Sequence, residues 1–488
     1  MKVVLITEGS RTIGFGHITR LTGIYQAFEE KGIMPKFYVN GDDTTNSLLS
    51  GKSVEIINWI ENESSLFEKI KDADIAVVDS YLANLEFYKK LSEMVGLLVS
   101  MDDNIRLPYP NGVVVNGTFE SENWQFNKIE GVAYLFGSQY MPLRKAFWNI
   151  PEKKICDTVQ VLMITFGGED FRNMTPKVLK GLNEAYPNIR KKVIIGSAFN
   201  HVKEIEEYTN ENVELIFSPD ADDMKKIMLE SDIAITAGGQ TLYELACCGV
   251  PAIAVQVADN QKNNIVGALK LGVIEFAGEW DDEGLIFKII SNVNVLMSKE
   301  EREKKYKIGK SLVVNNSSKK DVEVFIEIFG EKSILVRTAS ANDVMSVLEL
   351  SNENEVRSNS FNSEPISVEN HKIWFAKKIQ DYHTVFLIAE INNDFLGQIR
   401  FEIENNKAVV GVSVRKNYRR YGFGKIIMKK SLDFLKKSRP NIISVFAYIK
   451  EDNIPSIKYF QSCKFLPVQE ILFNGFKSWE YIYKYDEQ

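Results

Sequence analysis

Short apolar runs alternate with amphipathic stretches along the first two thirds of the chain, and this alternation constrains the fold more than any other feature. Residues 3–6, 37–39, 75–78 and 97–99 are apolar runs, and each is followed by polar loop residues. Such runs are typical of strands that are buried on both faces. Strands that alternate with helical stretches predict an α/β fold with parallel, doubly wound sheets.

The pattern restarts after Pro151, where a second series of strand-like runs begins. We therefore predict two Rossmann-like domains, residues 1–150 and 151–330. Paired domains of this type commonly bind a nucleotide-containing ligand in the cleft between them. The second series comprises residues 159–164, 193–195, 213–216 and 233–235.

A third domain is predicted for residues 331–488. A strand at 334–337 and a helix at 342–350 precede further strand-like runs, two of which are joined by the turn 392–394 and are expected to be antiparallel. Residues 300–332 are rich in Lys, Glu, Ser and Asn, so we expect a terminal helix followed by a linker there.

Composition excludes several classes of protein. The 488 residues are 44% hydrophobic and 26% charged, which is ordinary for a globular protein and excludes a disordered chain. A net charge of −7 leaves no general basic surface for nucleic acid or a membrane, and no apolar run approaches the ~20 residues that span a bilayer. Four cysteines without a CxxC pair, and no signal peptide, predict a cytoplasmic protein without structural zinc.

A glycine motif with a histidine follows the first predicted strand. Gly14 and Gly16 permit close approach of the backbone to a ligand, and the helix that follows points free N–H groups at an anion. His17 stands at the start of this helix, where an ordinary pKa near 6.5 suits a general base or acid. The alternative is a structural glycine turn with a capping histidine.

Polar residues also follow the later strands of the first domain. In doubly wound folds, ligands bind at the carboxyl ends of the strands, so these residues are candidate ligand contacts. The alternative is that they cap helices and close turns. The residues are Asp79, Tyr81, Asp102, Asp103 and Asn116.

Two glycine loops mark the second domain. The loop with Gly239 follows a strand and opens a helix, so its N–H groups and the Thr241 hydroxyl can hold a pyrophosphate. Glu244, on the same helix, is a candidate acceptor for ribose hydroxyls. The alternative is that Thr241 and Glu244 form a capping box, which needs no ligand. The other loop, with Gly167 and Gly168, is expected to face the same cleft.

In this order, the motifs resemble those of the UDP-sugar hydrolase family of pseudaminic acid biosynthesis. That family cleaves UDP from UDP-2,4-diacetamido-2,4,6-trideoxy-β-L-altropyranose, has the GT-B fold and is related to the UDP-GlcNAc transferase of peptidoglycan synthesis. The resemblance covers roughly residues 1–300. The motifs are Gly14-x-Gly16-His17-x-x-Arg20, Asp79-x-Tyr81, Asp102-Asp103, Gly137-x-x-Tyr140-x-Pro142-Leu143-Arg144-x-x-Phe147, Phe166-Gly167-Gly168, Gly239-x-Thr241-x-x-Glu244, Gly249-x-Pro251 and Asn260-Gln261.

The resemblance implies roles for individual residues. His17 matches the family's general base, which activates a water molecule for attack on the anomeric carbon with inversion. Tyr81 and Asn260 match residues on the sugar side of the site, and no metal is implied. The chain departs from the family where Gly239-Gln240-Thr241-Leu242-Tyr243-Glu244 stands for Ser-Thr-Thr-Trp-Glu, and where Ser80 replaces a histidine. The other implied substrate contacts are Gly14, Gly16, Arg20, Asp79, Gly167, Gly168, Gly239, Thr241, Glu244 and Gln261.

The third domain carries an Arg-x-x-Gly-x-Gly loop between a strand and an amphipathic helix, and successive N–H groups of such a loop can hold a pyrophosphate. With the downstream segment 453–465, it resembles the GNAT N-acetyltransferase superfamily over about residues 333–488. The segments around Trp374 and Gln398 resemble its amino-sugar branch. The resemblance implies a mixed, largely antiparallel sheet and acetyl-CoA as co-substrate. The implied cofactor contacts are Val414, Arg419, Arg420, Gly422, Phe423, Gly424, Lys425 and Asn453.

The third domain also departs from its superfamily. Many members have a tyrosine, the acid toward the leaving thiolate, where this chain has Phe460. Tyr459 comes one position earlier, where a helix turns it about 100° away. The alternatives are that water acts as this acid or that the acetyltransferase domain is impaired. His371 and Glu402 are weak candidates for a base, and His371 beside Trp374 is more often a packing residue.

The two resemblances imply consecutive reactions. We predict a bifunctional enzyme that acetylates the 4-amino group of UDP-4-amino-4,6-dideoxy-β-L-AltNAc and then hydrolyses the product to UDP and 2,4-diacetamido-2,4,6-trideoxy-L-altrose. One alternative is a GT-B glycosyltransferase fused to an acetyltransferase. The other is a regulator that binds a UDP-sugar and CoA without turnover.

Overall fold

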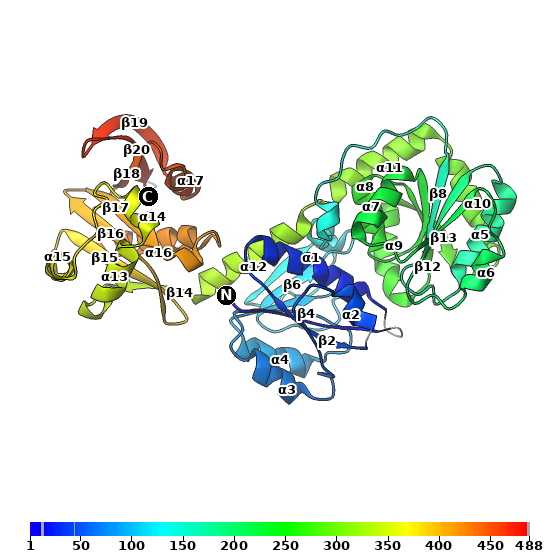
Figure 1. Ribbon diagram of the computed structural model, residues 1–488, viewed down its shortest axis with the longest axis horizontal. Helices are drawn as coiled ribbons and strands as arrows, with labels where there is room; N and C mark the ends of the chain where they lie inside the picture. The colour runs from blue at the N-terminus through cyan, green and yellow to red at the C-terminus, as the bar shows by residue number, and fades with distance from the viewer. Residues whose placement is uncertain (11–13, 43, 486–488) are drawn as a thin grey trace. The chain divides into compact units, whose positions relative to one another are not determined.

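The structure is a computed structural model that describes residues 1–10, 14–42 and 44–485. The chain forms two compact units, residues 1–325 and 326–488 (Figure 1). No helix among the described residues is long and apolar enough to cross a membrane.

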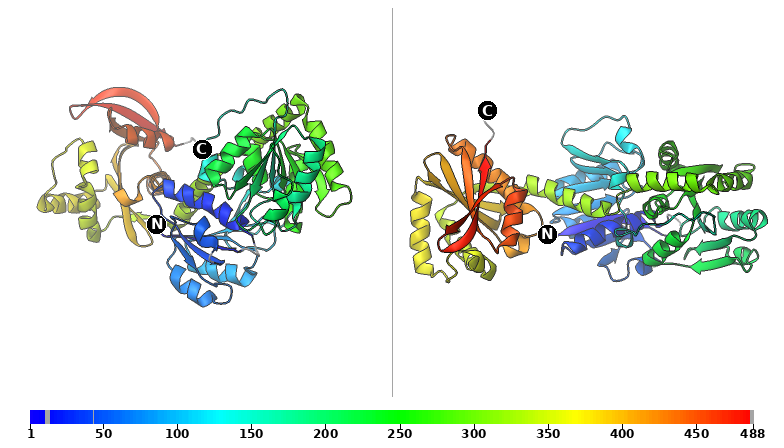
Figure 2. Two further views of the ribbon diagram at one scale, coloured as in Figure 1. Left: turned by 45° about the vertical axis from the view of Figure 1, so that its right-hand side comes forward. Right: turned by 90° about the horizontal axis from the view of Figure 1, so that it is seen from above.

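The first unit begins with a seven-stranded sheet in the order β3-β2-β1-β4-β5-β6-β7, and every neighbouring pair in it is parallel. Helices cover both faces (Figures 1 and 2). The strands are β1 (Val3–Gly9), β2 (Lys36–Gly41), β3 (Val54–Ile56), β4 (Ile75–Asp79), β5 (Leu97–Met101), β6 (Gly112–Asn116) and β7 (Val132–Phe136). The helices are α1 (Gly16–Glu30), α2 (Thr44–Leu48), α3 (Glu63–Ile70) and α4 (Leu85–Met94).

A second parallel sheet of six strands, in the order β10-β9-β8-β11-β12-β13, completes the first unit. The predicted pair of doubly wound parallel sheets is therefore confirmed. The strands are β8 (Val161–Thr165), β9 (Arg190–Ile195), β10 (Val213–Phe217), β11 (Ile233–Ala237), β12 (Ala252–Gln256) and β13 (Ile274–Glu279). The helices are α5 (Met174–Ala185), α6 (Val202–Glu206), α7 (Ala221–Glu230), α8 (Thr241–Cys248), α9 (Lys262–Lys270) and α10 (Leu285–Leu296).

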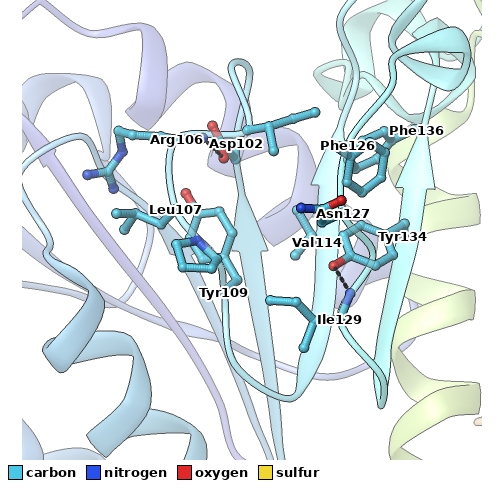
Figure 3. A pocket seen from close by; sticks show the side chains of 12 residues that line it. Asp102, Arg106, Leu107, Tyr109, Val114, Phe126, Asn127, Ile129, Tyr134 and Phe136 are labelled. Atoms are coloured by element: carbon cyan, nitrogen blue, oxygen red, sulfur yellow. Dashed lines mark hydrogen bonds between the residues drawn. The ribbon is translucent and has the colours of Figure 1, made fainter.

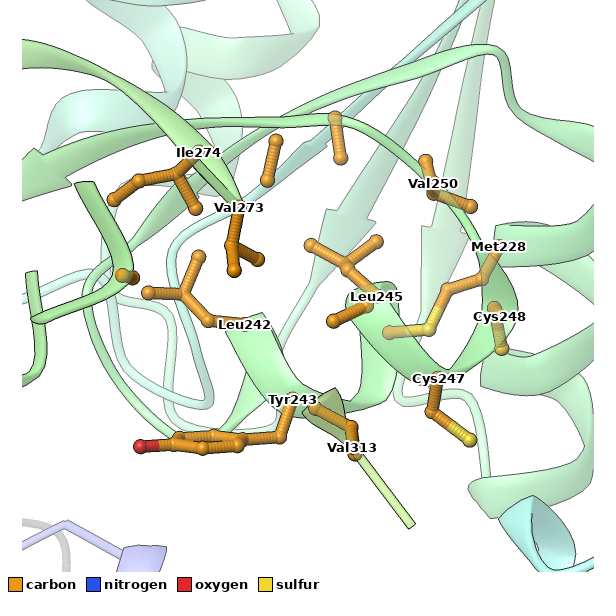
Figure 4. Close-up of a cluster of buried hydrophobic side chains, with 14 of the residues drawn as sticks. Met228, Leu242, Tyr243, Leu245, Cys247, Cys248, Val250, Val273, Ile274 and Val313 are labelled. Carbon is orange, nitrogen blue, oxygen red and sulfur yellow. The ribbon is translucent and has the colours of Figure 1, made fainter. Parts of the chain in front are cut away.

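Helix α8 connects the second sheet with the segment that follows β6 of the first. Its inner face, with Leu242 and Leu245, packs into a buried apolar cluster (Figure 4). Its Tyr243 ring stacks on Phe119, in the segment after β6, with ring centroids 4.3 Å apart. The Tyr243 hydroxyl accepts a hydrogen bond from the Phe119 N–H (3.1 Å) and donates one to Asn264. The helix that opens at the Gly239 loop is thus fixed to the first sheet.

Residues 300–332, where we expected a terminal helix followed by a linker, form two helices, α11 (Lys299–Leu312) and α12 (Ser317–Ser333), and α12 leads directly into the next strand. The Ser317 and Ser318 hydroxyls donate to the carbonyl groups of Met141 and Leu143 at 2.5 and 2.7 Å. Despite its many charged residues, α12 is an amphipathic helix, because its apolar residues recur at helical spacing and are buried. These residues are Val322, Phe325, Ile326 and Phe329.

The second unit contains one seven-stranded sheet in the order β14-β15-β16-β17-β18-β20-β19. All neighbouring pairs are antiparallel except β17 and β18, which confirms the expected mixed, largely antiparallel sheet. The strands are β14 (Ile334–Thr338), β15 (Thr384–Ile391), β16 (Asp394–Glu404), β17 (Lys407–Val414), β18 (Ser444–Lys450), β19 (Leu466–Phe473) and β20 (Phe476–Lys484). The helices are α13 (Val344–Ser351), α14 (Asn354–Asn359), α15 (Val368–Gln380), α16 (Phe423–Ser438) and α17 (Ile454–Ser462).

Strands β17 and β18 pair over three residues only, from Lys407 with Ser444 to Val409 with Phe446. Beyond this point the two strands are not paired with each other, although both continue, to Val414 and Lys450 respectively. Their backbone groups on the facing edges are therefore available to an extended ligand.

Close packing of α1 against the segment 141–143 and α12 gives a stability prediction. A methyl group on Gly23 would lie 2.7 Å from the Leu143 carbonyl oxygen and 2.8 Å from Ser318 Oγ. Alanine gains about 1 kcal/mol of helix propensity, but overpacking against a backbone oxygen, which cannot move aside as a side chain does, costs about 2–3 kcal/mol, the upper part of the usual range. We expect Gly23→Ala to lower the free energy of unfolding in urea by about 1–2 kcal/mol.

Gly411→Ala is the matched control for that substitution, because a methyl group at Gly411 meets no atom within 4 Å. It is expected to leave the unfolding free energy unchanged or slightly raised. A Gly23→Ala protein as stable as this control would show that α1 and α12 are not packed as described.

Candidate active sites

The first site is built around a buried pair of His17 and Asp79. His17 lies in the first turn of α1, and Asp79 ends β4, which pairs with β1 beside that helix. The Nδ1 atom of His17 lies 2.7 Å from Asp79 Oδ1. Both side chains are buried, at 9% and 1% exposure. The parallel sheet thus joins a helix start and a strand end that are 62 residues apart in the chain.

Arg20, one turn further along α1, binds the same carboxylate. Its Nε and Nη2 atoms donate to the two oxygens of Asp79 at 2.7 and 2.6 Å. Its Nη1 atom donates to Asp103 at 2.5 Å, and the other oxygen of Asp103 accepts from the Tyr81 hydroxyl at 3.0 Å. The Tyr81 ring meets the His17 ring edge to face, with centroids 4.6 Å apart. The structure therefore brings these sequence-predicted residues together.

The charges of this network set the protonation of its members. Burial alone would raise the pKa of Asp79, but the positive charges of Arg20 and His17 outweigh burial and lower this pKa to about 2. Burial alone would lower the pKa of His17, but the adjacent Asp79 outweighs it and places this pKa above the ordinary value. Asp79 therefore remains an anion and fixes a proton on Nδ1, so that Nε2 is the basic nitrogen.

The glycine loops meet beside this network. Gly14 has a φ of 85°, and Gly16 is the first residue of α1. Gly168, in the loop after β8, lies so that a methyl group on it would be 3.5 Å from the Phe15 ring. The loop Gly167-Gly168 is thus adjacent to the turn that carries His17. A methyl group at Gly16 or Gly239 would meet nothing within 4 Å, so both glycines border open space.

Side-chain amides fix the loop that precedes α8. The Gln261 Oε1 atom accepts hydrogen bonds from the N–H groups of Gly238 and Val257, both at 3.1 Å. The Asn264 Nδ2 atom donates to the Gly238 carbonyl at 2.7 Å. Gln261 therefore holds the loop that precedes α8 in place through these two hydrogen bonds. Asn260 is exposed, and no described hydrogen bond joins it to His17 or Tyr81.

The capping-box alternative for α8 is wrong. The residue before the helix is Gln240, and it makes no side-chain cap. Glu244 is buried, and its Oε1 atom accepts two hydrogen bonds from Arg144, at 3.0 Å from Nε and 2.8 Å from Nη2. Thr241 is the first residue of the helix. A sequence search for local caps misses this ion pair, because its partner is 100 residues away.

The two aspartates after β5 have different roles. Asp103 belongs to the network of Arg20 and Tyr81, whereas Asp102 accepts hydrogen bonds from the N–H groups of Asn104 (2.9 Å) and Arg106 (2.7 Å) and so closes a turn. Asn116 also closes a turn, because its Oδ1 atom accepts from the Thr118 N–H. Asp102 lines a small pocket with mostly apolar walls (Figure 3), whose other lining residues include Leu107, Tyr109, Val114, Phe126 and Phe136.

The second unit places the predicted cofactor loop at the open end of β17. Arg420 and Gly422 both have positive φ, 71° and 84°, and α16 begins at the next residue. Arg419 is turned inward: its Nε atom donates to the Val414 carbonyl at 2.7 Å, and its guanidinium pairs with Glu353 and Glu355. It shapes the loop. The side chains of Arg420 and Lys425 are exposed, and that of Phe423 is buried in the core.

Helix α17 fixes the start of α16. The Tyr459 hydroxyl donates to the Gly424 carbonyl at 3.0 Å, and a methyl group on Gly424 would lie 2.9 Å from the Tyr459 ring. Phe460 is buried at 6% exposure. Asn453 caps α17 by accepting from the Ser456 N–H at 3.2 Å, which leaves its Nδ2 atom to donate elsewhere.

Neither weak candidate for an acetyltransferase base lies at the open end of the strands. His371 is buried at 1% exposure, its Nε2 atom is 3.0 Å from the Val344 carbonyl, and burial lowers its pKa. Glu402 pairs in register with Val409, where β17 and β18 are still joined, and it contacts Lys378 and Arg400. His371 is therefore a packing residue, as the alternative expected.

Comparison with known proteins matches two stretches of the chain to family models. Residues 161–322 match the model of the glycosyltransferase family 28 C-terminal domain, and residues 347–465 match that of the acetyltransferase (GNAT) family. The resemblance inferred from the motifs is confirmed at this level. The chain combines a glycosyltransferase-like part with a GNAT domain, which supports an enzyme and implies binding of acetyl-CoA.

Individual proteins also match, one of them over nearly its whole length and another over less than half of it. The uncharacterized protein MJ1062 of Methanocaldococcus jannaschii is 24% identical over 501 residues, 95% of this chain and 96% of that protein. The pseudaminic acid cytidylyltransferase and UDP-2,4-diacetamido-2,4,6-trideoxy-beta-L-altropyranose hydrolase of Helicobacter pylori is 25% identical over 267 residues, 54% of this chain and 45% of that protein. A solved structure of spermidine N-acetyltransferase from Vibrio cholerae with CoA and spermine aligns over 31% of this chain and 95% of that chain, with 16% identity and a TM-score of 0.29.

The His17–Asp79 pair predicts a measurable titration. In protein labelled with ¹³C-histidine, NMR should show His17 titrating above pH 6.5. In Asp79→Asn its pKa should fall below that value, because burial and Arg20 then dominate. Since folding raises this pKa, protonated His17 stabilises the native state below about pH 6.5, and this contribution is lost as the pH rises through the folded pKa.

The matched control for this titration is Asp72→Asn, which removes an exposed carboxylate that pairs with Lys2. It should leave the His17 titration unchanged. The account is contradicted if His17 titrates identically in Asp79→Asn and in the unmodified protein.

The contact between Gly424 and Tyr459 gives a prediction for cofactor binding. Gly424→Ala should displace the first turn of α16 and weaken CoA binding at least tenfold by isothermal titration calorimetry, because the turn's N–H groups lose their alignment. Lys437→Ala, at an exposed position near the far end of α16, should bind CoA normally. If both variants bind CoA with equal affinity, the CoA pyrophosphate does not bind at the first turn of α16.

Proposed function

We propose that the first unit hydrolyses a UDP-linked diacetamido sugar and that the second unit makes this substrate by N-acetylating the corresponding UDP-linked amino sugar. The observation that carries the proposal is the buried His17, whose Nδ1 is held by Asp79 beside two glycine loops. The name of the Helicobacter pylori relative, aligned over 54% of this chain, supports this choice of sugar.

In the proposed hydrolysis, His17 acts as a general base. Its Nε2 atom takes a proton from a water molecule, whose oxygen forms a bond to the anomeric carbon. The bond between that carbon and the diphosphate oxygen breaks, and its electron pair leaves with UDP. The sugar keeps the new hydroxyl group, and His17 passes its proton to solvent. Asp79 stabilises the imidazolium that forms in this step.

The diphosphate is assigned to the loop that precedes α8. The backbone N–H groups there and the positive end of the helix dipole favour an anion. Gly239 leaves room for this approach, and the amides of Gln261 and Asn264 hold the loop in place. Preorganised donors of this kind stabilise the charge that develops on the leaving group. The ion pair with Arg144 orients Glu244 at the same end of the second sheet.

In the proposed acetylation, the loop 419–425 holds the pyrophosphate of CoA and the unpaired edges of β17 and β18 bind its extended arm. The amine nitrogen of the sugar forms a bond to the carbonyl carbon of the acetyl thioester, the carbon–sulfur bond breaks and releases the CoA thiolate, and the nitrogen loses one proton to solvent. Phe460 has no proton to give, and the Tyr459 hydroxyl donates to the carbonyl group of Gly424. We therefore assign protonation of the leaving thiolate to solvent.

A second candidate function is glycosyl transfer fused to acetylation. It is favoured by the match of residues 161–322 to the glycosyltransferase family 28 C-terminal domain. Transfer places the sugar on an acceptor hydroxyl, whereas hydrolysis releases a free reducing sugar, so analysis of the products distinguishes the two. A regulator that binds both ligands without turnover would be stabilised against heat by UDP and CoA but would form no product.

The proposal predicts the products of a mass-spectrometric assay. With UDP-4-amino-4,6-dideoxy-β-L-AltNAc and acetyl-CoA, the unmodified protein should release UDP and the free diacetamido sugar. His17→Ala should still acetylate but should accumulate the acetylated UDP-sugar, with hydrolysis reduced by about 10²–10⁴-fold. Hydrolysis by the unmodified protein should decline as the pH falls below the raised pKa of His17, because the base becomes protonated.

The control for His17→Ala is His201→Ala, which removes an exposed histidine from another part of the unit. It should retain both reactions. Acetylation without any release of UDP by the unmodified protein would refute the hydrolase assignment and point to transfer or another sugar. The absence of acetylation would refute the assignment of the second unit.

A further inference from the structure

One buried carboxyl group beside His17 has no part in the proposed mechanism. Glu8 lies near the end of β1 and has no exposed surface. Its Oε1 atom accepts hydrogen bonds from the N–H groups of Tyr81 (2.6 Å) and Leu82 (3.3 Å). Its Oε2 atom is also buried and has no hydrogen-bond partner among the described residues. A half-satisfied buried carboxyl is costly, so its presence calls for an explanation.

The N–H groups that Glu8 binds belong to the turn between β4 and α4. The Ser80 hydroxyl oxygen accepts from the N–H groups of Leu82 (3.0 Å) and Ala83 (2.9 Å) in the same turn. Glu8 and Ser80 therefore satisfy the backbone N–H groups of Tyr81, Leu82 and Ala83. The sequence analysis missed Glu8, because it is a single acidic residue at the end of an apolar strand.

Tyr81 stands in the middle of this turn, and its side chain reaches the catalytic network. Its hydroxyl donates to Asp103 at 3.0 Å, and its ring packs edge to face on His17 at 4.6 Å. The short hydrogen bond from the Tyr81 N–H to Glu8 fixes the backbone from which that ring projects. A displacement of this backbone moves the ring with respect to the His17 imidazole.

We infer that Glu8 is a positioning residue: its acceptor oxygen fixes the turn 80–82 so that Tyr81 stays packed against His17. This inference rests on the proposed role of His17 in hydrolysis. Glu8 acts on the turn through hydrogen bonds to backbone, and its charge separately raises the pKa of the nearby His17. Glutamine, which keeps the acceptor oxygen, should therefore replace it, whereas methionine, of similar volume but without an acceptor, should not.

The test is NMR of full-length protein labelled with ¹³C-histidine, which has four histidines; the His17 signal is identified by its loss in His17→Ala. Tyr81→Leu provides the chemical shift of His17 without the ring current of Tyr81. The spectra are compared at a pH well above the folded pKa of His17, so that the imidazole is neutral in every variant and the lost charge of Glu8 does not change its protonation. There we expect Glu8→Met to move the His17 shift toward the Tyr81→Leu value and Glu8→Gln to leave it unchanged. The inference is overturned if Glu8→Met leaves the shift unchanged, or if Glu8→Gln moves it as far as Glu8→Met.

An activity measurement accompanies the NMR test. Glu8→Met should lower kcat for UDP release by about 10–100-fold, since small displacements in a site have effects of this size, and Glu8→Gln should stay within about threefold of the unmodified protein. If Glu8→Met does not fold, Glu8→Gln alone decides. A Glu8→Gln protein with a lower kcat, or with a His17 chemical shift that differs from that of the unmodified protein, overturns the inference. If the unmodified protein releases no UDP, the proposed function fails, while the NMR shifts still decide the role of Glu8.

Discussion

The first unit depends on the pairing of one buried anion, Asp79, with two hydrogen-bond partners on α1, Arg20 and His17. A carboxylate at 1% exposure is stable only if it is paired and hydrogen-bonded. His17 and Arg20 supply this pairing from successive positions of one helix face, and the parallel contact of β1 with β4 places the carboxylate beside them. The same arrangement that makes the anion tolerable gives His17 a fixed tautomer. The stability of this part of the fold and the chemistry proposed for it therefore have one origin.

Much of the fold follows from patterns that the sequence displays locally. Apolar runs separated by helical stretches indicate parallel sheets because such strands are buried on both faces. The glycine motif and the aspartate after β4 could be located because doubly wound folds place helix starts and strand ends at one edge. His17, Arg20 and Asp79 were found in this way. The helix α12 was missed because its charged residues dominate the composition, although its apolar positions keep helical spacing.

Other features of the site were not predictable, because they depend on partners that are distant in the chain. Glu244 satisfied the local pattern of a capping box, yet its carboxylate binds Arg144, which the fold brings from the first sheet. Glu8 carries no motif, and its role appears only when its carboxylate is seen to accept from the Tyr81 N–H, 73 residues away in the chain. In the second unit, Arg419 matched a phosphate-binding motif, but its guanidinium is engaged by Glu353 and Glu355. Local sequence patterns identify the loops, whereas the partners of individual side chains can be identified only from the tertiary structure.

The most direct test of the central claim is to run the reaction in H₂¹⁸O with the acetylated UDP-sugar as substrate. If His17 activates water for attack on the anomeric carbon, one ¹⁸O atom should appear at C1 of the released sugar and none in UDP. Appearance of ¹⁸O in the phosphate of UDP would show that the oxygen–phosphorus bond breaks instead. Either that result or the absence of label from the sugar would contradict the mechanism derived from the His17–Asp79 pair.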